Sequence, residues 1–204
     1  MVDEVLEVQE YLQGKNINPK CLYRICYMLV KWYKQQGLSH LEIREAIFNW
    51  GKTNNIYIHC NVNNIIYQAI NDKNRLRENV IVRINNNDIQ EIIKRFDSRN
   101  CKLLALSLLC LAKCSADRDG EFNVSLLALS NWTKIDYSNI SKRYLPELID
   151  FGYVSKQENK RVFSWDKNVK SKSVSLKIML PFSNSGTYIL KNNDIHELYD
   201  EIFT

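Results

Sequence analysis

Cysteine and histidine are the residue types in this chain that could act as soft ligands for a metal ion such as zinc. Cys21 and Cys26 lie five positions apart, and His59 and Cys60 follow further along, so four soft ligands could meet in a folded chain. None of the cysteines has the Cys-x-x-Cys spacing that is typical of structural zinc sites. A free cysteine in a folded protein usually behaves as a small buried hydrophobic residue. We therefore predict no metal site and six cysteines that are all thiols.

Common catalytic and nucleotide-binding motifs are absent from the sequence. The six glycines are too widely spaced to form the glycine-rich loops that bring backbone amides close to phosphate. The three histidines, His40, His59 and His196, lie far apart, and neither a His-Glu-x-x-His helix nor a Gly-x-Ser-x-Gly turn occurs. We therefore expect a protein that is not an enzyme and that needs no cofactor.

Basic residues are concentrated in the middle of the chain. The formal net charge is +5, and residues 99–173 contain 13 Lys and Arg against 8 Asp and Glu. A basic excess attracts phosphate groups or acidic proteins when it is gathered on one face, and otherwise it only solvates the surface. Its meaning therefore depends on the secondary structure that carries it.

Hydrophobic spacing predicts a helical bundle over residues 1–78. Four stretches have apolar residues at helical spacing. Gly37 is expected to end the second helix, Ser39 with Glu42 forms a capping box for the third, and Asn61 is expected to cap the fourth. The third helix is expected to turn these apolar residues inward: Leu41, Ile43, Ile47, Phe48 and Trp50.

Two similar strand-to-helix units flank the central region. A strand at Val80–Ile84 precedes an Asn-rich turn and a helix, and the same plan returns with a strand at Thr187–Leu190 and a final helix. Each unit contains Asp-Ile-x-Glu, at Asp88 and at Asp194, which is typical of a capping box. Duplication and convergence on the same capping chemistry explain this equally well. Since a lone strand and helix cannot bury an apolar face, we expect the units to pack near one another or to pair across a homodimer.

The central region begins with the most apolar stretch of the chain. Leu103–Ala112 is closed by lysines and is about half the roughly 20 residues that a bilayer span requires, so it predicts a buried core helix. A short strand at Glu121–Val124 and a helix capped by Ser125 follow.

A further helix and a hairpin complete the central region. Ser138 is expected to cap this helix, and Gly152 is expected to end it. Alternating apolar and polar residues then predict a hairpin with strands at Tyr153–Gln157 and Lys160–Trp165.

This order of elements resembles the winged helix-turn-helix DNA-binding superfamily. The resemblance covers Arg99–Trp165 and is clearest in SKRYLPELIDFGYVSKQENKRVF, where a helix runs through Phe-Gly into a basic hairpin. It implies a mainly α fold with small β-hairpins, in which residues 1–78 form a helical bundle and residues 79–204 form a winged-helix domain with core 99–165. The flanking segments are loosely similar to helical regions of phage and mobile-element replication proteins.

The resemblance also implies which residues contact DNA. In such domains the exposed N-terminal half of the recognition helix enters the major groove, and the wing contacts phosphates or the minor groove. Pro146 removes a backbone bond to the Lys142 carbonyl, so a kink in the helix is expected. The candidate DNA-contacting residues are Tyr137, Ser138, Asn139, Lys142 and Arg143 on the helix, with Lys156, Lys160 and Arg161 near the wing tip.

We therefore expect a DNA-binding protein with double-stranded DNA as its partner, either a transcriptional regulator or a replication accessory factor. The alternative is a winged helix that associates with a replication or transcription protein and does not touch DNA. The first residues are acidic where a signal peptide would have a basic start and an apolar stretch, so a cytoplasmic location away from membranes is expected.

Overall fold

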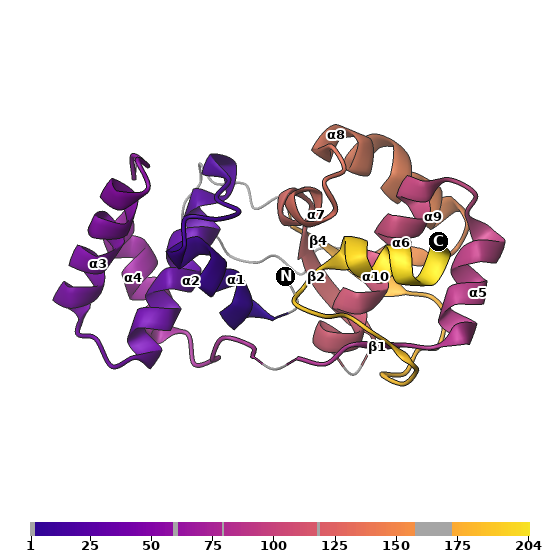
Figure 1. The fold of residues 1–204 in the computed structure, drawn as a ribbon, viewed down its shortest axis with the longest axis horizontal. Helices are drawn as coiled ribbons and strands as arrows, with labels where there is room; N and C mark the ends of the chain where they lie inside the picture. Colours follow the sequence, from indigo (N-terminus) through magenta and orange to yellow (C-terminus); the bar gives the residue numbers. More distant parts are fainter. Residues whose placement is uncertain (1–2, 59–60, 79, 118, 158–172) are drawn as a thin grey trace. The chain divides into compact units, whose positions relative to one another are not determined.

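The computed structural model describes residues 3–58, 61–78, 80–117, 119–157 and 173–204 (Figure 1). The chain divides into two compact units, Asp3–Asn79 and Val80–Thr204. The described residues are mainly helical with small antiparallel sheets, which confirms the mainly α class with small β elements that the sequence predicts.

The N-terminal unit is built from helices. Its elements are α1 (Glu4–Leu12), η1 (Pro19–Cys21), α2 (Leu22–Gln35), α3 (His40–Thr53) and α4 (Val62–Asn71). The capping box of Ser39 and Glu42 starts α3, and the Asn61 side chain accepts a hydrogen bond from the Asn64 amide at the start of α4. Gly37 follows the end of α2 with a φ of 84°, a value that favours glycine. These predictions are confirmed. Each concerns the end of one helix and depends only on residues within about one turn of it.

The prediction for the inward face of α3 is only partly correct. Ile43, Ile47 and Trp50 are buried as expected, and the Trp50 indole donates a hydrogen bond to the Tyr11 carbonyl. Leu41 and Phe48, however, are 69% and 45% exposed. The helix packs through a single narrow stripe, so apolar residues beside that stripe face solvent.

Paired charges stabilise the N-terminal unit. Arg24 pairs with Glu7 at 3.0 Å between α2 and α1. Lys31 pairs with Asp72 at 2.9 Å, and Arg77 pairs with Glu4 at 3.0 Å. These pairs join α1, α2 and the segment that follows α4.

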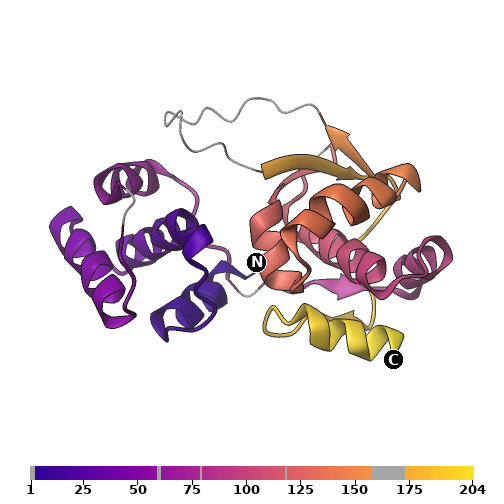
Figure 2. The same ribbon diagram turned by 90° about the horizontal axis from the view of Figure 1, so that it is seen from above.

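The C-terminal unit combines helices with two small sheets. Its elements are β1 (Arg83–Ile84), α5 (Asn86–Arg95), α6 (Arg99–Ser115), β2 (Glu121–Ser125), α7 (Leu126–Thr133), α8 (Tyr137–Asn139), η2 (Ile140–Tyr144), α9 (Leu145–Asp150), β3 (Val154–Gln157), β4 (Ser173–Ile178), β5 (Tyr188–Ile189) and α10 (Ile195–Phe203). Helix α6 is the centre of this unit, since α5, α7, α9, α10 and the larger sheet all contact it. Figure 2 shows α10 and the larger sheet on opposite sides of the helical core. The apolar stretch Leu103–Ala112 is buried, as its composition predicts.

The larger sheet has the strand order β2-β4-β3, with both pairings antiparallel. Among the described residues, β3 pairs with β4, Ser173–Ile178, whereas the sequence predicts Lys160–Trp165 as the partner of β3. Residues 160–165 lie outside the described part of the chain. Because β4 is the central strand and pairs with β2 as well, it places Leu176 and Ile178 in the core. That long-range requirement is invisible in the local alternation of apolar and polar residues.

The smaller sheet joins the two strand-to-helix units that flank the central region, β1 with α5 and β5 with α10. Arg83 pairs with Ile189 and Ile84 with Tyr188, and both α5 and α10 pack on α6. This confirms that the two units lie near one another within one chain. The first strand is shorter than the predicted Val80–Ile84.

The two flanking helices start differently, contrary to the shared capping pattern. Asn85 caps α5, and Asp88 is its capping-box partner, so the predicted Asn-rich turn is largely the first turn of α5. In α10, by contrast, Asp194 is itself the cap and accepts hydrogen bonds from the His196 and Glu197 amides. In the first strand-to-helix unit, Asn85 lies one helical turn before Asp88 and takes the capping position that the sequence pattern assigns to Asp88.

Candidate nucleic-acid interface

The segments α8, η2 and α9 follow one another without a break from Tyr137 to Asp150. We call this continuous segment the surface helix. Its N-terminal cap is Asp136, whose carboxylate accepts hydrogen bonds from the Ser138 amide at 2.8 Å and the Asn139 amide at 3.3 Å. The predicted cap at Ser138 is therefore wrong. Ser138 lies inside the first turn, where its own amide needs an acceptor.

Proline changes the geometry of the surface helix in its middle. Residues Ile140–Tyr144 form a π-helical segment, in which the Leu145 amide donates to the Ile140 carbonyl five residues earlier. Pro146 follows at once and cannot donate a hydrogen bond. The interruption expected at Pro146 is thus accommodated as a π segment, a feature that is frequent at functional sites.

Buried side chains and hydrogen bonds fix the surface helix on the unit. Ile140, Tyr144, Leu145 and Leu148 are buried in the core. The Asn100 amide group donates to the Tyr144 hydroxyl at 2.9 Å, which ties the helix to α6.

The ends of the surface helix are also held. The Ser130 hydroxyl donates to the Ile135 carbonyl at 2.6 Å in the turn that precedes the helix. The Arg95 guanidinium donates to the Phe151 carbonyl at 2.7 Å just after it. The helix is therefore presented by fixed contacts at both ends and along its inner face.

The N-terminal half of the surface helix brings polar and basic side chains together. Ser138, Asn139, Lys142 and Arg143 are all exposed. Tyr137 is only half-buried and packs against the core. Within the described residues, neither Lys142 nor Arg143 has a carboxylate partner within 4.0 Å. The Arg143 guanidinium instead lies 5.2 Å from the centre of the Tyr144 ring.

The remaining candidates lie in the predicted hairpin. Lys156 is exposed on β3, two residues after buried Val154, so it shares the face of the sheet that packs on the helices. The structure therefore places Lys156 on the same side of the sheet as the surface helix. Lys160 and Arg161 lie outside the described residues.

Charge is segregated along the surface helix. Lys142 and Arg143 lie in its first half, whereas Glu147 and Asp150 lie in its second half. Acidic residues near a helix C-terminus oppose the helix dipole, so Asp150 is not there to stabilise the helix. Apart from the capping carboxylate of Asp136, the first half of the helix is therefore basic and the second half is acidic.

Sequence reasoning missed one basic residue beside this surface. Lys134 is exposed in the turn between α7 and α8, with a φ of 57°. Its left-handed conformation has no signal in the sequence, because this region of backbone space favours glycine and asparagine. Lys134 adds a third positive charge near the N-terminal end of the surface helix.

The cysteines form no second candidate site among the described residues. No group of three or more His, Cys, Asp and Glu side chains is placed to hold a metal within the described part. Cys21 and Cys26 are described, whereas His59 and Cys60 lie outside that part. Burial raises the pKa of the Cys21 thiol and raises that of Cys101 to about 11, so both thiols are poor nucleophiles at neutral pH.

No known protein family, curated protein or solved structure matches this chain. In the described part of the chain, no helix combines the length and apolar character that crossing a membrane needs.

Proposed function

We propose that the chain binds double-stranded DNA as a winged-helix protein, with the N-terminal half of the surface helix in the major groove. One observation carries the proposal. Lys142 and Arg143 are exposed beside Asn139 on one rigidly held helix, without carboxylate partners among the described residues. Unneutralised cations on a fixed helix are suited to a polyanionic partner.

The order of the elements supports this proposal. Helix α6, strand β2, helix α7, the surface helix and strands β3 and β4 follow one another, and β4 lies between β2 and β3. A winged helix is expected to have two helices joined by a tight turn and a sheet whose last two strands form the wing. The turn at Lys134–Asp136 and the β3–β4 pair correspond to those parts.

The side-chain chemistry also suits the major groove. Arginine or lysine can donate hydrogen bonds to the acceptor atoms of guanine, and asparagine can form two hydrogen bonds with the edge of adenine. In this proposal Asn139, Lys142 and Arg143 read bases or bind phosphates, and Lys134 and Lys156 contact the backbone. Glu147 and Asp150 face away from the phosphates, because the helix enters the groove by its other end.

The decisive experiment selects bound sequences from a random duplex pool and then compares two double variants by fluorescence anisotropy. Lys142→Ala with Arg143→Ala is expected to abolish specific binding and to reduce the slope of log affinity against log salt by about 2. Arg83→Ala with Lys94→Ala removes two exposed charges from the same unit and should leave affinity nearly unchanged. Both double variants should have unfolding free energies within about 0.5 kcal/mol of the parent.

DNA binding would be rejected if the selection enriched no sequence and the chain showed no salt-dependent binding to duplex DNA. In that case, loss of a protein partner in the Lys142 and Arg143 variant alone would identify the surface helix as a protein-association surface. Equal duplex binding by the two double variants would move the DNA site elsewhere on the chain. Whether a DNA-binding chain acts in transcription or in replication then follows from the position of the selected sequence.

A further inference from the structure

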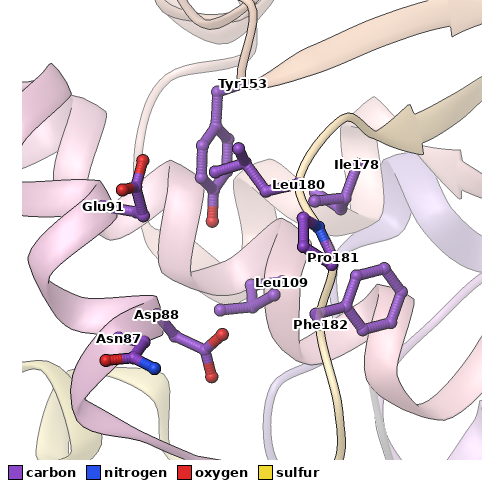
Figure 3. Close-up of a pocket in the computed structure, with 9 residues that line it drawn as sticks. All are labelled: Asn87, Asp88, Glu91, Leu109, Tyr153, Ile178, Leu180, Pro181 and Phe182. Carbon is purple, nitrogen blue, oxygen red and sulfur yellow. The ribbon is translucent and has the colours of Figure 1, made fainter.

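A cavity of about 240 Å³ lies in the C-terminal unit between α5 and the segment that follows β4 (Figure 3). Its apolar wall comes from α6, β4 and the following segment. The residues of this wall are Leu109, Ile178, Leu180, Pro181 and Phe182. A cavity of this size fits a compound of one small ring with a short substituent, near the lower end of ligand-binding pockets.

The polar side of the cavity consists mainly of hydrogen-bond acceptors. Asp88 and Glu91 line it from α5, and Figure 3 shows the Tyr153 hydroxyl directed into the space between them and Pro181. Tyr153 is 2% exposed, and its hydroxyl donates to the Ala105 carbonyl at 3.4 Å, which leaves its oxygen able to accept. A ligand that satisfies these groups must therefore supply donors.

Each carboxylate binds a cation that does not itself line the cavity. Lys113 binds Asp88 at 2.6 Å, and Arg95 binds Glu91 at 3.3 Å. The Asp88 oxygen that binds Lys113 also accepts from the Asn85 amide, so its other oxygen is the one left for a ligand. Glu91 keeps 38% of its side chain exposed, so its charge is accessible from the cavity mouth.

We propose that this cavity binds a small arylalkyl ammonium compound, with the aromatic ring against Leu109 and Pro181 and the ammonium group near Glu91 and the Tyr153 hydroxyl. An ammonium group has three donors and no acceptor, which complements the acceptor-rich side. An aromatic ring complements the apolar wall. The proposal is independent of DNA binding, because every residue in it lies outside the surface helix.

The test uses phenethylammonium as the probe, with 2-phenylethanol and phenylacetate as its neutral and anionic counterparts. Amide shifts in ¹H–¹⁵N spectra of the full chain report binding. Saturable shifts at Asn87, Glu91 and Ile178 are expected with phenethylammonium below about 10 mM, and phenylacetate should bind at least about tenfold more weakly. Glu91→Gln should weaken the binding of phenethylammonium at least about fivefold, whereas Lys94→Gln on the same helix should leave its affinity unchanged.

A second variant tests the cavity itself. Leu180→Trp fills the space from a partly exposed segment, and it should remove the shifts while the remaining spectrum stays folded. Absence of shifts at pocket amides with all three compounds would overturn the proposal. Equal binding of phenylacetate, or full binding to the Leu180→Trp variant, would overturn it as well.

Discussion

Cations hold segments together in both units of the chain, and in the C-terminal unit basic side chains also lie exposed on a helix that is held by fixed contacts. In the N-terminal unit, Arg24, Lys31 and Arg77 each bind a carboxylate and hold helices or connecting segments together. In the C-terminal unit, the Lys113 side chain is wholly buried in an ion pair, whereas Lys142 and Arg143 are exposed and have no carboxylate partner among the described residues. A paired cation contributes to structure, and an exposed cation without a partner is available for binding. The contrast is therefore between the cations that stabilise the fold and the exposed cations that we propose for DNA binding.

The largest expected effect is at Lys113, the buried member of the structural class. Its ammonium group donates to Asp88 and to the carbonyls of Arg83 and Ser183, with distances of 2.6–2.8 Å. Lys113→Met leaves these acceptors without their cation and should lower the unfolding free energy by about 3–5 kcal/mol, measured by urea denaturation. Lys94→Met, an exposed control, should change it by less than about 0.5 kcal/mol. If Lys113→Met lowered the unfolding free energy no more than Lys94→Met does, the Lys113 ion pair would not be a stabilising contact.

A smaller loss is expected at Glu7 in the N-terminal unit. Its carboxylate accepts from the Arg24 guanidinium at 3.0 Å and from the Tyr11 hydroxyl at 2.5 Å. Glu7→Gln keeps the shape but removes the charge, so a loss of about 1.5–3 kcal/mol in unfolding free energy is expected. Glu10→Gln on the same helix affects an exposed contact with Asn16 and should be nearly silent. If Glu7→Gln and Glu10→Gln lowered the unfolding free energy equally, the buried contacts of Glu7 would stabilise the protein no more than the exposed contact of Glu10.

The contribution of Glu7 should depend on pH. Burial alone would raise the pKa of Glu7, but the positive charges of the chain's amino terminus and of Arg24, together with the Tyr11 hydroxyl, outweigh burial and hold the pKa at about 2, below the ordinary 4.5. A carboxyl whose pKa is lower in the folded state stabilises the protein above its unfolded pKa and loses this effect as pH falls toward the folded pKa. The stability gap between the parent and Glu7→Gln should therefore be full at pH 7 and shrink between pH 4.5 and 2. A gap that stays constant over this range, measured by urea denaturation, would contradict the ion pair as its cause.

The smallest expected loss tests the corrected helix start. Asp136→Ala removes the cap of the surface helix and should lower the unfolding free energy by about 0.5–2 kcal/mol. Ser138→Ala removes the residue that the sequence predicts as the cap, and it should be nearly silent because the Ser138 side chain caps nothing. The reverse order of effects in thermal or urea denaturation would restore the sequence prediction.

Local chemistry explains what the sequence could predict. The capping box of Ser39 and Glu42, the Asn61 cap and the glycine after α2 all depend on residues within one helical turn. Where two capping residues lie close together, the sequence does not decide between them. Asp136 lies two residues before Ser138, and the observed start of the helix lies between the buried residues Ile135 and Ile140.

Long-range pairing explains what the sequence could not predict. The partner of β3 is separated from it by residues 158–172, and no local pattern requires β4 to lie between β2 and β3. Similarly, Lys113 and Asp88 lie 25 residues apart, and nothing in either segment indicates their ion pair. For the candidate site, the resemblance to winged helices predicted exposed basic residues at Lys142 and Arg143, and both are exposed. Lys134 and the cavity beside α5 were not predictable, because both depend on tertiary contacts.

The pairing of β1 with β5 has a consequence for the order in which the protein is made. Arg83 bonds to Asn184, 101 residues later, and the β1 strand pairs with β5 beyond it. A ribosome produces the chain from the N-terminus, and domains generally fold as they emerge. The Asp3–Asn79 unit can therefore fold during synthesis, whereas α6 keeps its α10-binding face uncovered until the segment after residue 184 has emerged. We therefore expect newly made chains to pass through a stage in which the N-terminal unit is folded and the C-terminal unit still exposes apolar surface.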